Sequence, residues 1–173
     1  MTMDQQLATK IAKEGFELFE QGKFEEAEIK YWDAIKLSDP SHWHSQDMYG
    51  EYGALLQALG KKTEAIVALK QAYGAARRCD KETSISVTVA RYFLADLLMK
   101  EGRFEEAEST LDNWFDQKCD GKWMMTFLKA KLSYLIKDEI TYKEYLDQTL
   151  ANAPEGKWNS VKEIIEFVEE NDS

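Results

Sequence analysis

The residues with the clearest capacity for chemistry are the two histidines, which form the pair His42-x-His44. Asp39 and Asp47 flank this pair, so the stretch offers the imidazole and carboxylate groups that bind zinc. A zinc site needs three or four ligands that converge on one point, and four residues in one short stretch constrain that geometry weakly. Pro40 within the stretch is typical of a loop. We therefore expect a structural role for the histidines and no metal site.

Two acidic runs are the next candidates, Glu25-Glu26-Ala27-Glu28 and Glu105-Glu106-Ala107-Glu108. Carboxylate pairs on facing helices can hold two iron ions, but such sites also need a histidine three residues after a glutamate. No histidine follows any glutamate at that spacing. We interpret both runs as helix starts that face water, where carboxylates stabilise the positive end of the helix dipole.

The two cysteines, Cys79 and Cys119, are too few for a disulfide scaffold. Each lies between a basic residue and an aspartate, and an adjacent cation favours the reactive thiolate. A redox role is therefore the alternative to our interpretation of both as residues near helix ends. The sequence contains neither a Gly-x-Ser-x-Gly nucleophile motif nor a Gly-x4-Gly-Lys phosphate loop. We predict no catalytic residues, no cofactor and no enzymatic activity.

Composition narrows the classes of partner. The chain has 173 residues and a formal net charge of -10, with 44% hydrophobic residues and only two prolines, which favours a helix-rich domain. Nucleic acids and anionic membranes are disfavoured partners because they require clustered lysine and arginine. No apolar run has the length of a signal peptide core or of a membrane span. A cytoplasmic location is the default expectation.

The strongest pattern in the sequence is a segment that occurs three times, which is the mark of a repeat protein. Each copy has a small residue, a glycine seven positions later and an alanine twelve positions after the small residue: Gly15, Gly22 and Ala27; Gly53, Gly60 and Ala65; Ala95, Gly102 and Ala107. Apolar residues at spacings of three and four on both sides of each glycine predict two helices. The glycine itself suits a left-handed cap at the end of the first helix. Each copy thus predicts a pair of antiparallel helices joined by a short turn.

This pattern resembles the tetratricopeptide repeat, whose signature reads W-x2-L-G-x2-Y and then A-x3-F. The first part corresponds to Ile11-x2-Glu14-Gly15-x2-Leu18, Tyr49-x2-Tyr52-Gly53-x2-Leu56 and Arg91-x2-Leu94-Ala95-x2-Leu98; the second corresponds to Ala27-x3-Tyr31, Ala65-x3-Leu69 and Ala107-x3-Leu111. We expect the small residues to permit close contact between the paired helices. The resemblance implies an all-α fold, a right-handed superhelix of antiparallel helix hairpins with three to four repeats.

The chain departs from the regular 34-residue period of this family. Gly22 and Gly60 are 38 positions apart and Gly60 and Gly102 are 42 apart, so we expect extra length in the second helix of unit two, the first helix of unit three, or the loops. A fourth, worn unit has Ala130 at the small position, Tyr142 in place of the alanine and Lys137-Asp138 at the turn. A tyrosine at that place should push the helices apart or shift the register.

We interpret residues 1–173 as a single domain with hairpin units at about 4–40, 43–80, 83–118 and 121–153. The final segment, 156–170, has apolar residues on one side and glutamates on the rest, which predicts a helix that caps the open end of the array. The alternative is a detachable arm that docks on a partner, because terminal segments are often loosely held.

Arrays of this kind present a concave face built from the first helix of each hairpin, so residues off the packing stripe of those helices are candidates for binding. These candidates are Lys13, Phe16 and Glu20 in unit one; Asp47, Glu51, Ala54 and Gln57 in unit two; Tyr92, Phe93, Asp96 and Lys100 in unit three; and Phe127, Lys131 and Tyr134 in unit four. Exposed aromatic residues with a polar rim are the usual make-up of a binding patch. The alternative is that the longer helices of unit three bury the aromatic residues.

The sequence therefore predicts a non-enzymatic adaptor that binds a protein or peptide with basic and apolar character on its concave face. The asparagine, lysine and arginine set that grips a C-terminal carboxylate in some family members is missing, with Glu51 and Asp96 in comparable places. One alternative is a tight inhibitor or immunity-type protein that neutralises a basic partner through the same acidic surface. Another is a scaffold that associates with itself.

Overall fold

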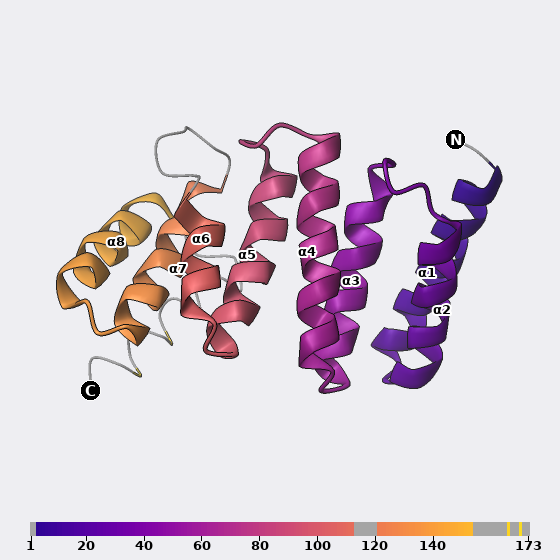
Figure 1. The fold of residues 1–173 in the computed structure, drawn as a ribbon, viewed down its shortest axis with the longest axis horizontal. Coiled ribbons are helices and arrows are strands. Elements are labelled where there is room, and N and C mark those ends of the chain that lie inside the picture. Colours follow the sequence, from indigo (N-terminus) through magenta and orange to yellow (C-terminus); the bar gives the residue numbers. More distant parts are fainter. Residues whose placement is uncertain (1–2, 113–120, 154–165, 167–169, 171–173) are drawn as a thin grey trace.

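A computed structural model describes residues 3–112, 121–153, 166 and 170. These residues form eight α-helices and no strand, arranged side by side along the long axis of the molecule (Figure 1). None of these helices is both long and apolar enough to cross a membrane. The helices are α1 (Met3–Glu20), α2 (Phe24–Leu37), α3 (His44–Ala58), α4 (Lys62–Cys79), α5 (Ile85–Lys100), α6 (Phe104–Asp112), α7 (Lys122–Leu135) and α8 (Glu139–Asn152).

The helices pack as successive hairpins, α1 with α2, α3 with α4, α5 with α6 and α7 with α8. In the first turn, the N–H of Lys23 donates to the carbonyl of Leu18 (3.0 Å), and the N–H of Gly22 donates to the carbonyl of Phe19 (2.9 Å). These are the two bonds of a Schellman cap, and they recur in the other three turns. The predicted left-handed glycine caps are confirmed, with φ of +74° at Gly22, +73° at Gly60 and +71° at Gly102.

The small residues of the repeat lie where the paired helices touch. A Cβ added to Gly53 would stand 2.8 Å from the Cδ2 atom of Leu69 on α4, which is closer than real carbon atoms approach. The repeat alanines on the second helices are completely buried: Ala27, Ala65 and Ala107. The prediction that small side chains allow close hairpin packing is confirmed.

The longer period of the second unit comes from its second helix. Helix α4 has 18 residues and α2 has 14, whereas the loops before α3 and α5 (38–43 and 80–84) differ by a single residue. The extra length of about one helical turn carries the end of α4 past the α2–α3 loop. There Arg78 Nη2 donates to the carbonyl of Pro40 (3.1 Å), and Cys79 Sγ donates to that of Ser41 (3.2 Å).

The fourth hairpin keeps the turn geometry without a glycine. Lys137 adopts the left-handed conformation with φ of +63°, and the N–H of Asp138 donates to the carbonyl of Ser133 (2.8 Å). Tyr142 is buried at the position of the alanine, with its ring against that of Tyr134. The expected capping helix, 156–170, lies outside the described residues except for Glu166 and Glu170, and the expected end of unit three, 113–118, lies outside them entirely.

The buried apolar residues form two clusters along the array. The smaller cluster joins α1, α2 and one side of α3, and it includes Tyr31, Met48 and Leu55. The larger cluster runs from Leu56 on the other side of α3 through α4, α5, α6 and α7. Tyr52 of α3 packs against both clusters. The core is thus a row of contacts between neighbouring helices rather than one central mass, as expected for a solenoid.

Candidate interaction surface

Two pockets lie between first helices of neighbouring hairpins, and we refer to them together as the first-helix groove. The larger pocket, of about 410 Å³, lies between α3 and α5 with α4 beneath. Its lining comprises Gln46, Asp47, Gly50, Glu51, Ala54, Gln57, Leu69, Ala72, Ile85, Ser86, Val89, Ala90 and Phe93. The smaller pocket, of about 210 Å³, lies between α1 and α3 and is lined by Thr9, Ala12, Lys13, Phe16, His44, Asp47, Met48 and Glu51.

Asp47 and Glu51 line both pockets and therefore connect them. They are four residues apart on α3, so their side chains lie on the same face of that helix, one turn apart. The Tyr31 hydroxyl donates to Glu51 Oε2 (2.8 Å). Neither carboxylate forms an ion pair with a lysine, arginine or histidine among the described residues. The groove thus carries two adjacent negative charges at its centre.

The two carboxylates differ in exposure, because Glu51 is partly buried whereas Asp47 is more exposed and loses only part of its hydration. Burial raises the pKa of Glu51, although the hydrogen bond from Tyr31 opposes this, and burial also raises the pKa of Asp47 against the influence of His44. Burial and then the charge of Glu51 raise the pKa of the Tyr31 hydroxyl, so Tyr31 acts as a donor. A charge that has lost part of its hydration gains more from a partner of opposite sign.

Seven of the candidates from the sequence come together in this groove. Lys13 and Phe16 line the smaller pocket, Ala54, Gln57 and Phe93 line the larger one, and Asp47 and Glu51 line both. Phe16 and Phe93 are 38% and 51% exposed, so their rings are available to a partner.

Three candidates are corrected by the structure. Phe127 is wrong as a surface residue because it is 0% exposed within the larger core cluster, where α7 is covered by α5, α6 and α8. Tyr92 is only 9% exposed and packs in the same cluster. Asp96 is 8% exposed, and its two carboxylate oxygens already accept from Lys131 Nζ (2.9 Å) and Lys100 Nζ (2.6 Å). The alternative that unit three buries its aromatic residues therefore holds for Tyr92 and fails for Phe93.

The remaining candidates lie outside both pockets. Glu20 ends α1 and is exposed. Lys100 and Lys131 both form ion pairs with Asp96. Burial by itself would raise the pKa of the Asp96 carboxyl group, but the two ammonium groups outweigh burial and lower that pKa. Tyr134 lies at the exposed end of α7.

Sequence reasoning missed the apolar wall of the larger pocket. On α5, Ile85, Val89 and Phe93 are spaced four residues apart and form a stripe, separate from the buried stripe of Val87, Leu94 and Leu98. Ile85 is about half exposed although it is apolar. A helix with apolar residues on two faces must cover two surfaces or leave one open. That second stripe was the available signal for this wall.

The residues first considered for chemistry have structural contacts. His44 Nδ1 lies 3.1 Å from Thr9 Oγ1, and burial lowers the pKa of His44. Asp39 Oδ1 accepts from the backbone N–H (2.9 Å) and the hydroxyl (2.7 Å) of Ser41. Across residues 3–112 and 121–153, no three histidine, cysteine, aspartate or glutamate side chains gather closely enough to hold a metal ion. Cys79 is a free thiol at the end of α4, and Cys119 lies outside the described residues.

Comparison with known proteins identifies the repeat. The tetratricopeptide repeat family model matches residues 46–79, which correspond to α3 and α4. The structure of PilF from Pseudomonas aeruginosa is similar with a TM-score of 0.64 and 21% identity, covering 94% of this chain and 66% of that one. BtubC from P. vanneervenii is similar with a TM-score of 0.74 and 14% identity, covering 91% of this chain and 69% of that one. The chain spans about two thirds of the length of each.

A search of curated proteins gave no match. The recurring hairpins, the family match in the second unit and the two similar structures agree on one architecture. Stacked repeats of this kind create extended concave surfaces that serve in binding. The chain has a tetratricopeptide-like helical repeat fold, and its second unit matches the tetratricopeptide repeat model.

Proposed function

We propose that the first-helix groove binds a segment of another protein that carries both apolar and basic residues, and that the protein acts as an adaptor. The observation that carries this proposal is the shared position of Asp47 and Glu51, two carboxylates without a cationic partner among the described residues, between two apolar pockets. Apolar anchors beside complementary charge are the usual elements of a binding surface.

Charge over the whole chain supports the same class of partner. The formal net charge of -10 attracts a basic segment from a distance and accelerates its encounter with the groove. The same property would serve an inhibitor that neutralises one basic partner. The two roles differ in affinity: an inhibitor has one very tight, salt-sensitive partner, whereas an adaptor binds several segments more weakly.

A substitution that fills the groove tests the proposal. Ala54 is exposed and lines the larger pocket, so Ala54→Trp should occupy the pocket without disturbing the core. The matched control is Val67→Trp, which adds the same ring to an exposed position of α4 that lines neither pocket. Fluorescently labelled proteins would be applied to an array of random 12-residue peptides at two salt concentrations.

We expect the peptides bound by the unmodified protein to be enriched in lysine, arginine and large apolar residues. Ala54→Trp should weaken their binding about tenfold or more, equivalent to about 1.4 kcal/mol, while Val67→Trp leaves it unchanged. Circular dichroism of both variants checks that the helices are intact. Equal binding by folded Ala54→Trp and by the unmodified protein would refute a role for the groove.

A further inference from the structure

The larger pocket is a half-open, mainly apolar hollow that a bulky side chain can enter, and we refer to it as the socket. Leu69 and Ala72 of α4 line its base and are almost completely buried, while Ile85, Val89 and Phe93 form an apolar wall on α5. Its volume of about 410 Å³ lies within the range of about 300–1,000 Å³ that ligand pockets occupy. The smaller pocket, at about 210 Å³, falls below that range. The larger pocket is therefore the place for an anchoring residue of a partner.

One edge of this socket is acidic. Asp47 and Glu51 stand one helical turn apart on α3, and the nearby basic side chains, the Lys13 ammonium and the His44 imidazole, line the smaller pocket. Glu51 has no ion pair among the described residues, and in this it differs from the other carboxylates of the first helices that are not exposed, because Glu14 has Lys30 at 2.6 Å and Asp96 has Lys100 and Lys131. The difference marks the edge formed by Asp47 and Glu51 as the place for a cation that a partner supplies.

A third feature of the socket is an acceptor atom that has no hydrogen-bond donor. Gln46 lines the larger pocket, and its Oε1 atom is buried without a hydrogen-bond partner in the described part of the chain. A buried carbonyl oxygen without a donor is unfavourable, so a ligand gains affinity if the Gln46 side chain turns toward the pocket and the ligand supplies a donor. Among bulky apolar side chains, tryptophan and tyrosine carry a donor on the ring.

We propose that the partner inserts a tryptophan or tyrosine side chain into the pocket between α3 and α5, and that a lysine or arginine next to it in the partner pairs with Asp47 and Glu51. This specificity rests on the proposed function of the groove. Aromatic residues and arginine are the residue types that most often dominate binding energy at interfaces. The pairing of one ring with one cation makes the groove selective for basic–aromatic sequences over segments that are only basic or only apolar.

Tryptamine tests this proposal because it joins an indole ring to an ammonium group within one small molecule. The complete 15N-labelled chain would be titrated with tryptamine and followed by amide chemical shifts. We expect the largest shifts at pocket residues such as Gly50, Ala54 and Val89. 3-Indolepropionate, which replaces the ammonium group by a carboxylate, should shift these amides much less at equal concentration.

The double variant Asp47→Asn, Glu51→Gln removes two charges while keeping side-chain size and the acceptor for Tyr31. It should bind tryptamine about three- to tenfold more weakly, and it should no longer prefer tryptamine to 3-indolepropionate. The control Glu25→Gln, Glu26→Gln makes the same charge change at exposed positions of α2 and should bind like the unmodified protein. A control that weakens binding equally would overturn the local pairing in favour of a general effect of net charge.

The outcome is separable from that of the proposed function. Peptides that bind in a groove sensitive to Ala54→Trp but show no preference for a basic–aromatic pair would overturn this inference and leave the proposed function standing. Peptide binding that is insensitive to Ala54→Trp would refute the proposed function itself. Tryptamine shifts confined to residues outside both pockets would also overturn the inference.

Discussion

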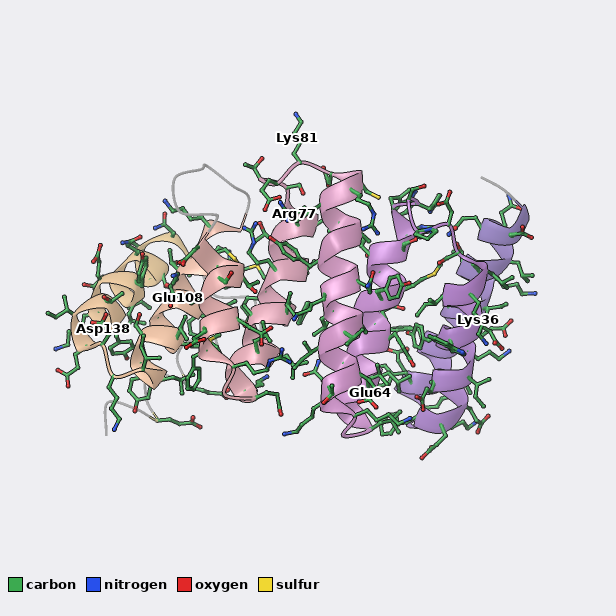
Figure 2. The ribbon with its side chains drawn as sticks, in the orientation of Figure 1. Lys36, Glu64, Arg77, Lys81, Glu108 and Asp138 are labelled. Atoms are coloured by element: carbon green, nitrogen blue, oxygen red, sulfur yellow. The ribbon has the colours of Figure 1, made fainter. Side chains whose placement is uncertain are left out.

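Arg91 occupies the position that an aromatic residue takes at the start of the tetratricopeptide signature, and its side chain is completely buried. Its Nε and Nη2 atoms donate to the Tyr73 hydroxyl (3.2 and 3.0 Å), and Nη2 also donates to Glu82 in the α4–α5 loop. Arg77, which projects at the same end of α4 (Figure 2), pairs with Glu82 as well (2.7 Å). A buried charge is tolerated only where it is paired and hydrogen-bonded.

The cost of stranding this charge should exceed the cost of removing it. Glu82→Ala leaves the guanidinium buried without its counter-ion and should lower the free energy of unfolding by about 3 kcal/mol. Arg91→Met removes the charge and keeps much of the volume, so it should cost only about 1 kcal/mol. Urea denaturation followed by circular dichroism measures both. Arg77→Met is the control, because it removes only the exposed Arg77–Glu82 ion pair and should lower the free energy of unfolding by about 0.5 kcal/mol. Equal losses from the first two variants would show that packing and hydrogen bonding, rather than the stranded charge, set the cost.

At the residue scale, the repeat positions were predictable and the exposure of the residues between them was not. Gly53 and Ala65 could be assigned because three copies impose the same steric demand. Phe127 could not, since its exposure depends on α5, α6 and α8 all packing around α7, and the weak fourth copy gives no sign of how closely they approach. Phe93 and Tyr92 are adjacent in sequence, yet one is about half exposed and the other buried.

At the scale of elements, the turn between α7 and α8 shows what the repeat glycine contributes. The other three turns have glycine in the left-handed conformation, whereas Lys137 adopts it here with a side chain. Asp138 follows Lys137, marks this turn in Figure 2, and caps α8 by accepting from the N–H of Thr141 (3.1 Å). A residue with a Cβ atom pays about 1–2 kcal/mol to adopt the left-handed conformation. The turn of the degenerate fourth repeat is therefore strained at Lys137.

Restoring the glycine should stabilise the protein. Lys137→Gly should raise the free energy of unfolding by about 0.5–1 kcal/mol, because relief of backbone strain exceeds the added freedom of the unfolded chain. The converse change, Gly102→Ala, should lower it by about 1 kcal/mol, and because an added Cβ at Gly102 meets no atom within 4 Å, that loss reports backbone strain alone. Urea denaturation gives both values. A loss of stability in Lys137→Gly would mean that the lysine side chain stabilises the turn by more than its strain costs.

The presence of extra length was predictable from the sequence, while the element that carries it and the spacing between elements were not. The interval of 42 residues between Gly60 and Gly102 predicts extra length, and α4 supplies it with 18 residues. The pocket between α3 and α5 depends on how α4 separates them, which is a property of packing across two units. The apolar stripe of Ile85, Val89 and Phe93 was visible in the sequence, but the same stripe would suit a fully buried helix.

At the scale of the whole molecule, stability should be distributed along the array in segments. In a solenoid each unit contacts only its neighbours, so a region with weak contacts to the rest can open by itself. The two core clusters meet at Tyr52, whose ring packs against both and lies with its centroid 6.2 Å from that of Tyr31 on α2. The first hairpin is thus coupled to the remainder through α3, where Met48 and Leu55 belong to the smaller cluster and Tyr52 is the side chain that contacts both clusters.

Tyr52→Ala should weaken the coupling of the first hairpin to the rest of the array. Because Tyr52 is partly buried, we expect a loss of about 2 kcal/mol, which corresponds to about thirtyfold faster amide hydrogen exchange in α1 and α2. Exchange in α5 and α7 should change little, since their packing lies within the larger cluster. Phe104→Ala is the control, because Phe104 packs against the larger cluster only and its loss should accelerate exchange in α5 and α6 while α1 and α2 keep their protection. Equal acceleration in all helices of the Tyr52 variant would show instead that the clusters unfold together, and the first-helix groove, which spans both clusters, would then open only with global unfolding.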